Sequence, residues 1–345
     1  MPSLTPFRGI AAAVFTLASP PAPAQSAQPP VPATAPAPAA SAASAASGDD
    51  LGSRVFGVRY FQPYEDNYML YQQMDNRGWA ERDESAWRGH YSFKYSLLCR
   101  PRPEPPSQTE SRKNRSECDD TNELFLFYTG AFDFYMGTRP SSPVINRLSN
   151  PGLQWRMPWR RRFGLGVMAP SNAFVGLEHL SNGQTTEISS PREIEAVQRA
   201  YQARDRAYFD QISRGVDFVS LAADWQSDDG TGFAGRLQLR HYLHQDTNVT
   251  WGPLARTKPR LADYQRASML LRYALNDAVS LETRWTLGDR GLKTDSWDLG
   301  LQVSLWQEAV PLYVQVHHGP LNTLSNYTQQ QDSIGIGLRF NHFIQ

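Results

Sequence analysis

Residues 279–287 read Val-Ser-Leu-Glu-Thr-Arg-Trp-Thr-Leu, an alternation of apolar and polar side chains with a period of two. Successive side chains of a β-strand point to opposite faces, so this stretch has one mainly apolar face and one polar face. Long amphipathic strands in series predict an all-β protein and favour a barrel. Alternation alone does not decide whether the apolar face meets lipid outside or a soluble core inside. The same pattern recurs in residues 233–243, 299–305, 312–316 and 334–340.

The spacing of these strands indicates the kind of barrel. Twelve strands are expected, near residues 67–74, 87–98, 122–136, 153–168, 172–181, 214–226, 233–243, 262–275, 278–288, 294–306, 309–317 and 333–343. Tight turns are expected at Pro170-Ser171, Ser227–Gly230, Asn276-Asp277 and Gln307-Glu308, and long connections at 137–152, 182–213, 244–261 and 318–332. Short turns on one rim, long loops on the other and an even strand count are typical of outer-membrane proteins. The sequence therefore predicts a twelve-stranded antiparallel transmembrane β-barrel, with the long connection at 99–121 as an exception.

The first 50 residues differ in composition from the rest. Arg8 precedes an apolar stretch from Gly9 to Ala18, and Ala22-Pro23-Ala24 is a small-x-small cleavage pattern, so residues 1–24 are expected to be a signal peptide. Residues 25–50 are rich in Ala, Pro and Ser and are expected to be a disordered tether. The barrel domain is expected to occupy residues 51–345.

Charge and cysteine content narrow the function classes. The chain carries 34 Lys and Arg and 34 Asp and Glu, so no net charge points to nucleic acid. No apolar run approaches 20 residues, which excludes helical membrane spans. The two cysteines, Cys99 and Cys118, do not resemble a zinc site; in an exported chain a disulfide between them is expected.

One segment departs from the β pattern. Ser190 at an N-cap, Pro191 at the first helical position and Glu193 two residues later form a helix start with a capping box. A helix is expected from there to about Gln211, inside the long connection that follows the fifth strand.

The end of the fifth strand carries the side chains that could perform catalysis. His179 and Ser181 share parity with Val175 and Leu177, so an imidazole and a hydroxyl emerge on the apolar face. Antiparallel pairing with the next strand would place Asp217 beside His179. A hydroxyl needs a base to attack an ester, and a carboxylate can orient that base. A lone His and Ser could instead mark the polar end of a strand, but three such groups on one apolar face favour function.

The stretch Glu178-His179-Leu180-Ser181-Asn182-Gly183 resembles the HxSNG signature of the outer-membrane phospholipase A family. The likeness extends over roughly residues 60–343. It includes residues 65–71, similar to the family's first strand, residues 141–143, similar to a calcium-loop segment, and residues 312–316, 319, 327 and 335–337, which follow the closing strands.

The resemblance implies a bacterial outer-membrane enzyme that hydrolyses phospholipid acyl esters at the A1 and A2 positions, with lysophospholipids as a further candidate substrate. It implies Ser181 as nucleophile, His179 as base and Asp217 as the orienting residue, where the family's type member has Asn. It also implies an oxyanion donor at the Gly183 backbone, calcium activation and an active homodimer. The calcium positions map to Ser141, Gln184 and Ser213, of which Gln184 replaces an Arg.

Two other classes compete with this hypothesis. A passive barrel, porin-like or structural, would carry the same strands with an inactive motif, although twelve strands enclose only a narrow lumen. A soluble secreted esterase is weaker, because the chain lacks the GxSxG elbow and the alternating strand–helix order of that class.

Overall fold

The structure of the protein is a computed structural model. It describes residues 61–75, 83–99, 121–139, 141, 143–159, 168–184, 191–227, 232–243, 260–276, 278–304, 310–325 and 327–340. The expected signal peptide, the expected tether and Cys118 lie outside the described residues. Among the helices described, none is long and apolar enough to cross a membrane.

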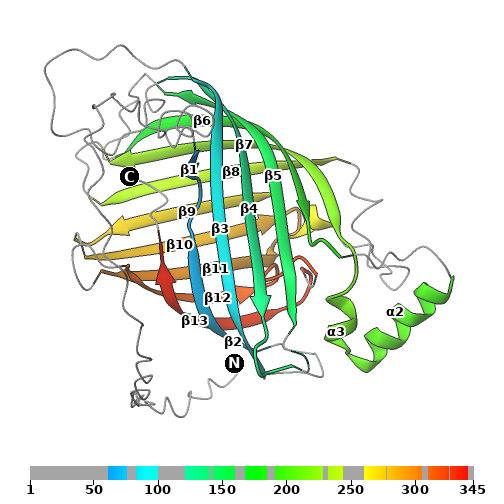
Figure 1. Ribbon diagram of the computed structural model, residues 1–345. Helices are drawn as coiled ribbons and strands as arrows, with labels where there is room; N and C mark the ends of the chain where they lie inside the picture. Colours follow the sequence, from blue (N-terminus) through cyan, green and yellow to red (C-terminus); the bar gives the residue numbers. More distant parts are fainter. Residues whose placement is uncertain are drawn as a thin grey trace, which may run out of the picture. The chain divides into compact units, whose positions relative to one another are not determined.

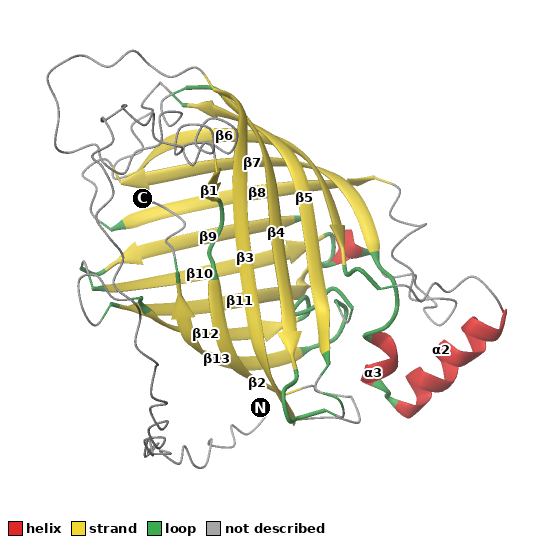
Figure 2. Cartoon of the chain, viewed as in Figure 1, coloured by secondary structure: helices red, strands yellow, loops and turns green. Residues whose placement is uncertain are grey.

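The described strands form one antiparallel sheet that closes on itself through the pairing of β3 with β4 (Figures 1 and 2). Its strands are β1 (Phe61–Pro63), β2 (Tyr68–Asp75), β3 (Asp83–Cys99), β4 (Glu123–Phe134), β5 (Val144–Pro158), β6 (Met168–Ser181), β7 (Gly215–Ser227), β8 (Phe233–Leu243), β9 (Ala267–Ala274), β10 (Val279–Gly288), β11 (Gly291–Val303), β12 (Leu312–Gly319) and β13 (Gln331–Arg339). β1 and β2 pair with successive parts of β3 and together fill one position. The predicted closed barrel of twelve antiparallel strands is confirmed.

The apolar face of each strand points outward. Leu177, Leu221 and Ile334, from β6, β7 and β13, are each more than half exposed on the outer wall. Ion pairs fill the interior instead: Arg88 donates to Asp133 at 2.7 and 2.9 Å. This arrangement is opposite to that of a soluble barrel, so the apolar face of the alternating strands lies outside and not in a soluble core.

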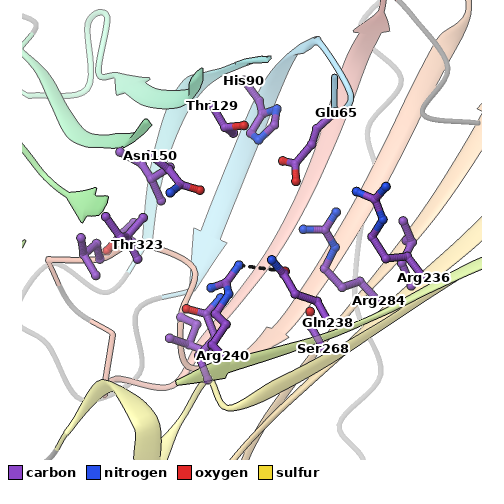
Figure 3. A pocket seen from close by; sticks show the side chains of 16 residues that line it. Glu65, His90, Thr129, Asn150, Arg236, Gln238, Arg240, Ser268, Arg284 and Thr323 are labelled. Atoms are coloured by element: carbon purple, nitrogen blue, oxygen red, sulfur yellow. Dashed lines mark hydrogen bonds between the residues drawn. The ribbon is translucent and has the colours of Figure 1, made fainter. Parts of the chain in front are cut away.

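The lumen also holds a polar cavity of about 200 Å³. Figure 3 shows Arg236, Arg240 and Arg284 on one side of it and Glu65 and His90 on another. The barrel interior is therefore lined by charged and polar side chains, as the polar faces of the strands predict.

Two connections lie elsewhere than the sequence predicts. β5 begins at Val144, so most of the expected loop at 137–152 is strand, and the turn expected at Pro170-Ser171 lies inside β6 at an irregularity of register. In both places the sequence contains turn-forming residues, and the predictions of a loop and a turn there are wrong. Pro151 is accommodated because β5 pairs with β4 at that position, through Tyr128, while its ladder to β6 is interrupted.

The predicted helix is present but divided. It comprises α2 (Pro191–Ala203) and the single turn α3 (Arg206–Phe209). Arg204 between them has a positive φ of 56°, and the Asp205 carboxylate accepts a hydrogen bond from the Tyr208 N–H at 3.1 Å as the cap of the second turn. The expectation of one continuous helix to Gln211 is therefore wrong at Arg204.

We call the end of the barrel that carries these helices the helix-bearing rim. Apolar residues close it: a buried cluster joins Val197 and Phe209 of the helical segment to Leu261, at the start of a 3₁₀ helix (Leu261–Asp263), and to Leu324 and Tyr327 of the β12–β13 connection. At the opposite rim, Cys99 ends β3 and is disulfide-bonded. This agrees with the predicted disulfide.

Candidate active site on the outer wall

The end of β6 and the start of β7 place three candidate residues together at the helix-bearing rim. His179 lies directly opposite Asp217 in the register of the two strands, and Ser181 lies opposite Gly215. Cross-strand partners project to the same face of a sheet. All four positions therefore lie on the outer wall, in line with the exposed Leu177, as the parity of the sequence predicts.

His179 and Asp217 form a hydrogen-bonded pair. The Nδ1 atom of His179 is 2.8 Å from Oδ1 of Asp217, and the two side chains are 46% and 56% exposed. With its proton on Nδ1, the ring donates to the carboxylate and keeps a lone pair on Nε2. The predicted orienting contact is present, and it selects the tautomer that can act as a base.

Ser181 and the His179 ring border the same open space. A Cβ atom placed on Gly215 would lie 3.7 Å from Cβ of Ser181 and 3.6 and 3.9 Å from Cε1 and Nε2 of His179. Among the described residues, no hydrogen bond joins the Ser181 hydroxyl to His179. Such bonds are often loose without substrate, and rotation of the serine about χ1 can close this one.

Gly215 keeps that space open, which leads to a prediction. A methyl group at this position would make ordinary contacts with both side chains, whereas a branched side chain would fill the space that the imidazole shares with Ser181. We expect Gly215→Ala to retain any hydrolysis by this site within about threefold and Gly215→Val to lose about 10²-fold, the usual cost of a displacement of about 1 Å. Val219→Leu, at the outward position beyond Asp217, is the control. Equal activity of the alanine and valine variants would contradict the idea.

Behind the outer wall, side chains inside the barrel hold β6. Pro151 has no N–H, and the register on either side, with Ser149 opposite Ser181, places it opposite His179. The Asn150 side chain donates to the His179 carbonyl at 2.9 Å and so takes the place of the missing backbone donor. Asn150 is not among the residues predicted from the sequence, although an Asn beside a strand proline is a usable signal.

The candidate calcium residues lie around the same rim. Gln184 and Arg214, the neighbour of Ser213, donate their backbone N–H groups to one acceptor, Oδ1 of Asn182, at 3.4 and 2.9 Å. Two of the three candidate ligands are thus brought together. Ser141 has a positive φ of 62°, and among the described residues no hydrogen bond joins it to the other two. Among the described residues no group of three or more His, Cys, Asp or Glu side chains could hold a metal ion.

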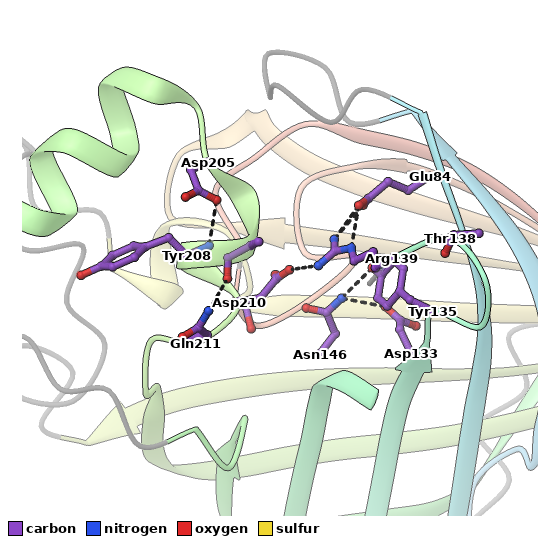
Figure 4. A network of polar contacts seen from close by, with 12 residues as sticks. Glu84, Asp133, Tyr135, Thr138, Arg139, Asn146, Asp205, Tyr208, Asp210 and Gln211 are labelled. Atoms are coloured by element: carbon purple, nitrogen blue, oxygen red, sulfur yellow. Dashed lines mark hydrogen bonds and ion pairs between the residues drawn. The ribbon is translucent and has the colours of Figure 1, made fainter. Parts of the chain in front are cut away.

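The connection that carries Ser141 is nevertheless linked to the helical segment. Arg139 donates to the Glu84 carboxylate at 2.7 and 2.9 Å and to Asp210 at 2.9 Å (Figure 4). Asp210 lies three residues before Ser213. A buried cation therefore joins the β4–β5 connection, the start of β3 and the approach to β7.

Comparison with known proteins agrees with this fold. The chain is similar to outer membrane phospholipase A from Escherichia coli, with 18% identity and a TM-score of 0.57 over 82% of this chain and 92% of that one. It is also similar to the calcium-bound dimer of the Salmonella typhi protein, with 16% identity and a TM-score of 0.58 over 82% of this chain and 93% of that one. No protein-family model and no curated protein sequence matches the chain. At these identities the likeness shows a shared barrel fold.

Proposed function

We propose that the protein is an outer-membrane phospholipase that hydrolyses phospholipid acyl esters with Ser181, using His179 as general base. The observation that carries this proposal is the outward-facing His179–Asp217 pair, with Ser181 at the next outward position on the same strand. Polar side chains presented to lipid are costly and are usually functional. Likeness of fold to the Escherichia coli and Salmonella typhi proteins supports the proposal independently.

The position of the site fits a lipid substrate. Leu177 and Leu221 precede and follow the pair along their strands and are 56% and 51% exposed. An acyl chain lying along this apolar wall would bring its ester to the rim, where Ser181 ends β6. A membrane lipid would reach this wall by lateral diffusion.

The groups present define the order of proton transfers. Ser181 Oγ would attack the ester carbonyl and pass its proton to His179 Nε2, while Asp217 stabilises the resulting imidazolium through Nδ1. The imidazolium would then protonate the leaving alcohol, which departs as the lysophospholipid. A water deprotonated by the same Nε2 would release the acyl group as a fatty acid and restore Ser181.

The negative charge on the carbonyl oxygen needs donors during both steps. The backbone N–H of Gly183 is the candidate, and neither Lys nor Arg occurs in residues 179–184. A bound calcium ion would supply further stabilisation of that charge through its water ligands. Hydroxyl and main-chain oxygens of Ser141, Gln184 and Ser213 are the hard donors that calcium prefers, so the residues fit the ion. With three protein ligands, waters and a second copy of the chain would complete the shell.

Interior packing argues against the porin-like form of the passive-barrel alternative. Asp66, Arg272, Glu282 and Arg339 form a buried ion-pair cluster across the lumen, in addition to the Arg88–Asp133 pair. Charged side chains locked across a twelve-stranded barrel leave no wide channel for solutes. The deciding experiment is release of fatty acid from mixed phospholipid–detergent micelles by purified protein. Release above the background of a heat-denatured sample supports the proposal, and its absence over a range of calcium concentrations would reject it.

Asp217 should matter less than Ser181. We expect Asp217→Ala to lower kcat by about tenfold to a hundredfold, because an exposed orienting group contributes less than the base itself, whose whole effect is about 10²–10⁴. Asp217→Asn keeps an acceptor for the Nδ1 proton and should retain more activity than the alanine variant. Initial rates in the micelle assay measure both. A loss in Asp217→Ala as complete as that in Ser181→Ala, in a folded barrel, would contradict this ranking.

A further inference from the structure

We propose that Asn182 is a positioning residue: its buried side chain shapes the turn that carries Gly183 and fixes that turn to the start of β7 and to Ser325. This inference rests on the proposed function, because it assigns the turn to the oxyanion side of Ser181. Asn182 follows the candidate nucleophile directly, yet its side chain points away from the outer wall and is fully buried.

The oxygen of the Asn182 side chain forms the turn. Oδ1 accepts a hydrogen bond at 3.4 Å from the N–H of Gln184, two residues further on, which is the pattern of an Asx-turn. Gly183 lies inside that turn with a φ of +61°, and nothing lies within 4 Å of a Cβ added to it. A glycine is therefore required at position 183 by the backbone conformation and not by a lack of room for a side chain. The Asn182 side chain thus constrains the peptide groups on both sides of Gly183.

The same residue extends the pairing of β6 with β7 beyond Ser181. Its backbone N–H donates to the Arg214 carbonyl at 3.0 Å, and its Oδ1 accepts from the Arg214 N–H at 2.9 Å. Its Nδ2 donates to the Ile212 carbonyl at 2.7 Å. Ser213 lies between these two partners, so a single carboxamide fixes both Gln184 and the segment through Ser213.

The β12–β13 connection, which is distant in sequence, also contacts Asn182. Nδ2 of Asn182 also lies 3.3 Å from Oγ of Ser325, which is fully buried in the β12–β13 connection. The Arg214 guanidinium donates from Nε to the Ser325 carbonyl at 2.9 Å. Ser325 therefore holds together the end of β6, at Ser181, and the start of β7, at Gly215.

Loss of this side chain has a specific expected consequence. In Asn182→Ala the Gln184 and Arg214 N–H groups lose their common acceptor, and the turn around Gly183 is no longer held. Misplacement of one oxyanion donor costs about 10²–10³ in rate. We expect Asn182→Ala to lower kcat by about 10²-fold with KM changed by less than about twofold, since the acyl-binding wall is untouched.

Two matched variants separate positioning from folding. Asn182→Asp keeps an acceptor for both N–H groups but loses the Nδ2 donor to the Ile212 carbonyl, so its kcat should lie between those of Asn182→Ala and wild type. Asn276→Ala is the control: Asn276 also forms an Asx-turn, with Oδ1 accepting from the Ala278 and Val279 N–H groups at 2.9 Å, but at the opposite rim. It should leave kcat unchanged. Rates are expressed per reactive serine, titrated with a fluorophosphonate, so that unfolded protein does not count.

Hydrogen–deuterium exchange supplies a readout that needs no activity. Peptides covering residues 182–184 and 212–216 should exchange faster in Asn182→Ala than in wild type, and in Asn276→Ala they should not. Unchanged exchange in Asn182→Ala, or a kcat of that variant within about threefold of wild type, would overturn the inference. A kcat of Asn182→Asp as low as that of Asn182→Ala would also overturn it. If wild-type protein shows no hydrolysis, the proposed function fails, and exchange alone decides whether Asn182 holds the turn.

Discussion

Replacing Ser181 or His179 with alanine should abolish ester hydrolysis while leaving a folded barrel. Ser181 would form the covalent acyl intermediate, and no other described residue on this part of the outer wall offers a hydroxyl beside an imidazole. Removal of a nucleophile or its base from a serine hydrolase costs up to about 10⁶ in kcat, so we expect losses of at least about 10³-fold in each variant. The two changes together should cost no more than either alone, because both groups act in the same step.

The barrel itself offers a matched control on its outer wall. His318 and Asp332 are opposite partners on β12 and β13, with Nδ1 and Oδ1 2.7 Å apart, and they share parity with the exposed Ile334 and Ile336. This second pair lies at the same rim, but β12 has Val316 where β6 has Leu177 and is followed by Pro320 where β6 has Ser181. His318→Ala should therefore leave hydrolysis unchanged.

Each variant needs a test of folding, because exposed positions at strand ends tolerate substitution but not always without loss of barrel stability. Heat-modifiable migration in detergent gels, with the same transition temperature as wild type, would show an intact barrel. Activity within tenfold of wild type in either Ser181→Ala or His179→Ala would remove the pair from the proposed mechanism. Equal loss in His318→Ala would indicate that outward histidines support the barrel rather than the chemistry.

The shared outward face of the three candidate residues could be predicted from the sequence because the information is local. Strand parity is a property of consecutive residues, so His179, Ser181 and Asp217 could be assigned to one face before any pairing was known. The register that places His179 opposite Asp217 follows from the strand ends, which the apolar pattern marks clearly.

The failures have a different origin. Residues 149–152 and Pro170-Ser171 carry strong turn signals, yet neighbouring strands pair across both, and tertiary pairing outweighs local preference. One contact of Asn182 is with Ser325, 143 residues away in sequence, and no periodicity within one strand could reveal such a partner. The apolar cluster at the helix-bearing rim is likewise assembled from three strands and three separate connections.

Removing calcium should abolish or strongly reduce hydrolysis, and the active form should contain two copies of the chain. The physical case begins with the oxyanion: attack by Ser181 places negative charge on the ester oxygen, and Gly183 offers one backbone donor. Losing even one good donor at such a site costs about 10²–10³ in rate. A divalent cation with water ligands near that oxygen is the remaining source of stabilisation in the proposed site.

The ligand set explains why a second copy would be needed. Gln184 and Ser213 are held near each other through Asn182, whereas Ser141 lies on the β4–β5 connection, and among the described residues no hydrogen bond joins it to either of them. A Ser141 oxygen from a neighbouring barrel could complete the shell, and two apolar walls facing each other would bury an acyl chain along their length. The calcium-bound Salmonella typhi structure, which is a dimer, has the same fold.

The experiment is a titration of calcium in the micelle assay, with chemical cross-linking at each point. Activity and cross-linked dimer should rise together, and excess chelator should reduce the rate by about 10²-fold or more. Ser213→Ala tests a hydroxyl ligand, and Ser280→Ala, a β10 serine at the opposite rim, is its control. A shift of the calcium midpoint in Ser213→Ala alone would support the site. Full activity in chelator, or from a species that stays monomeric throughout the titration, would rule out a shared calcium site.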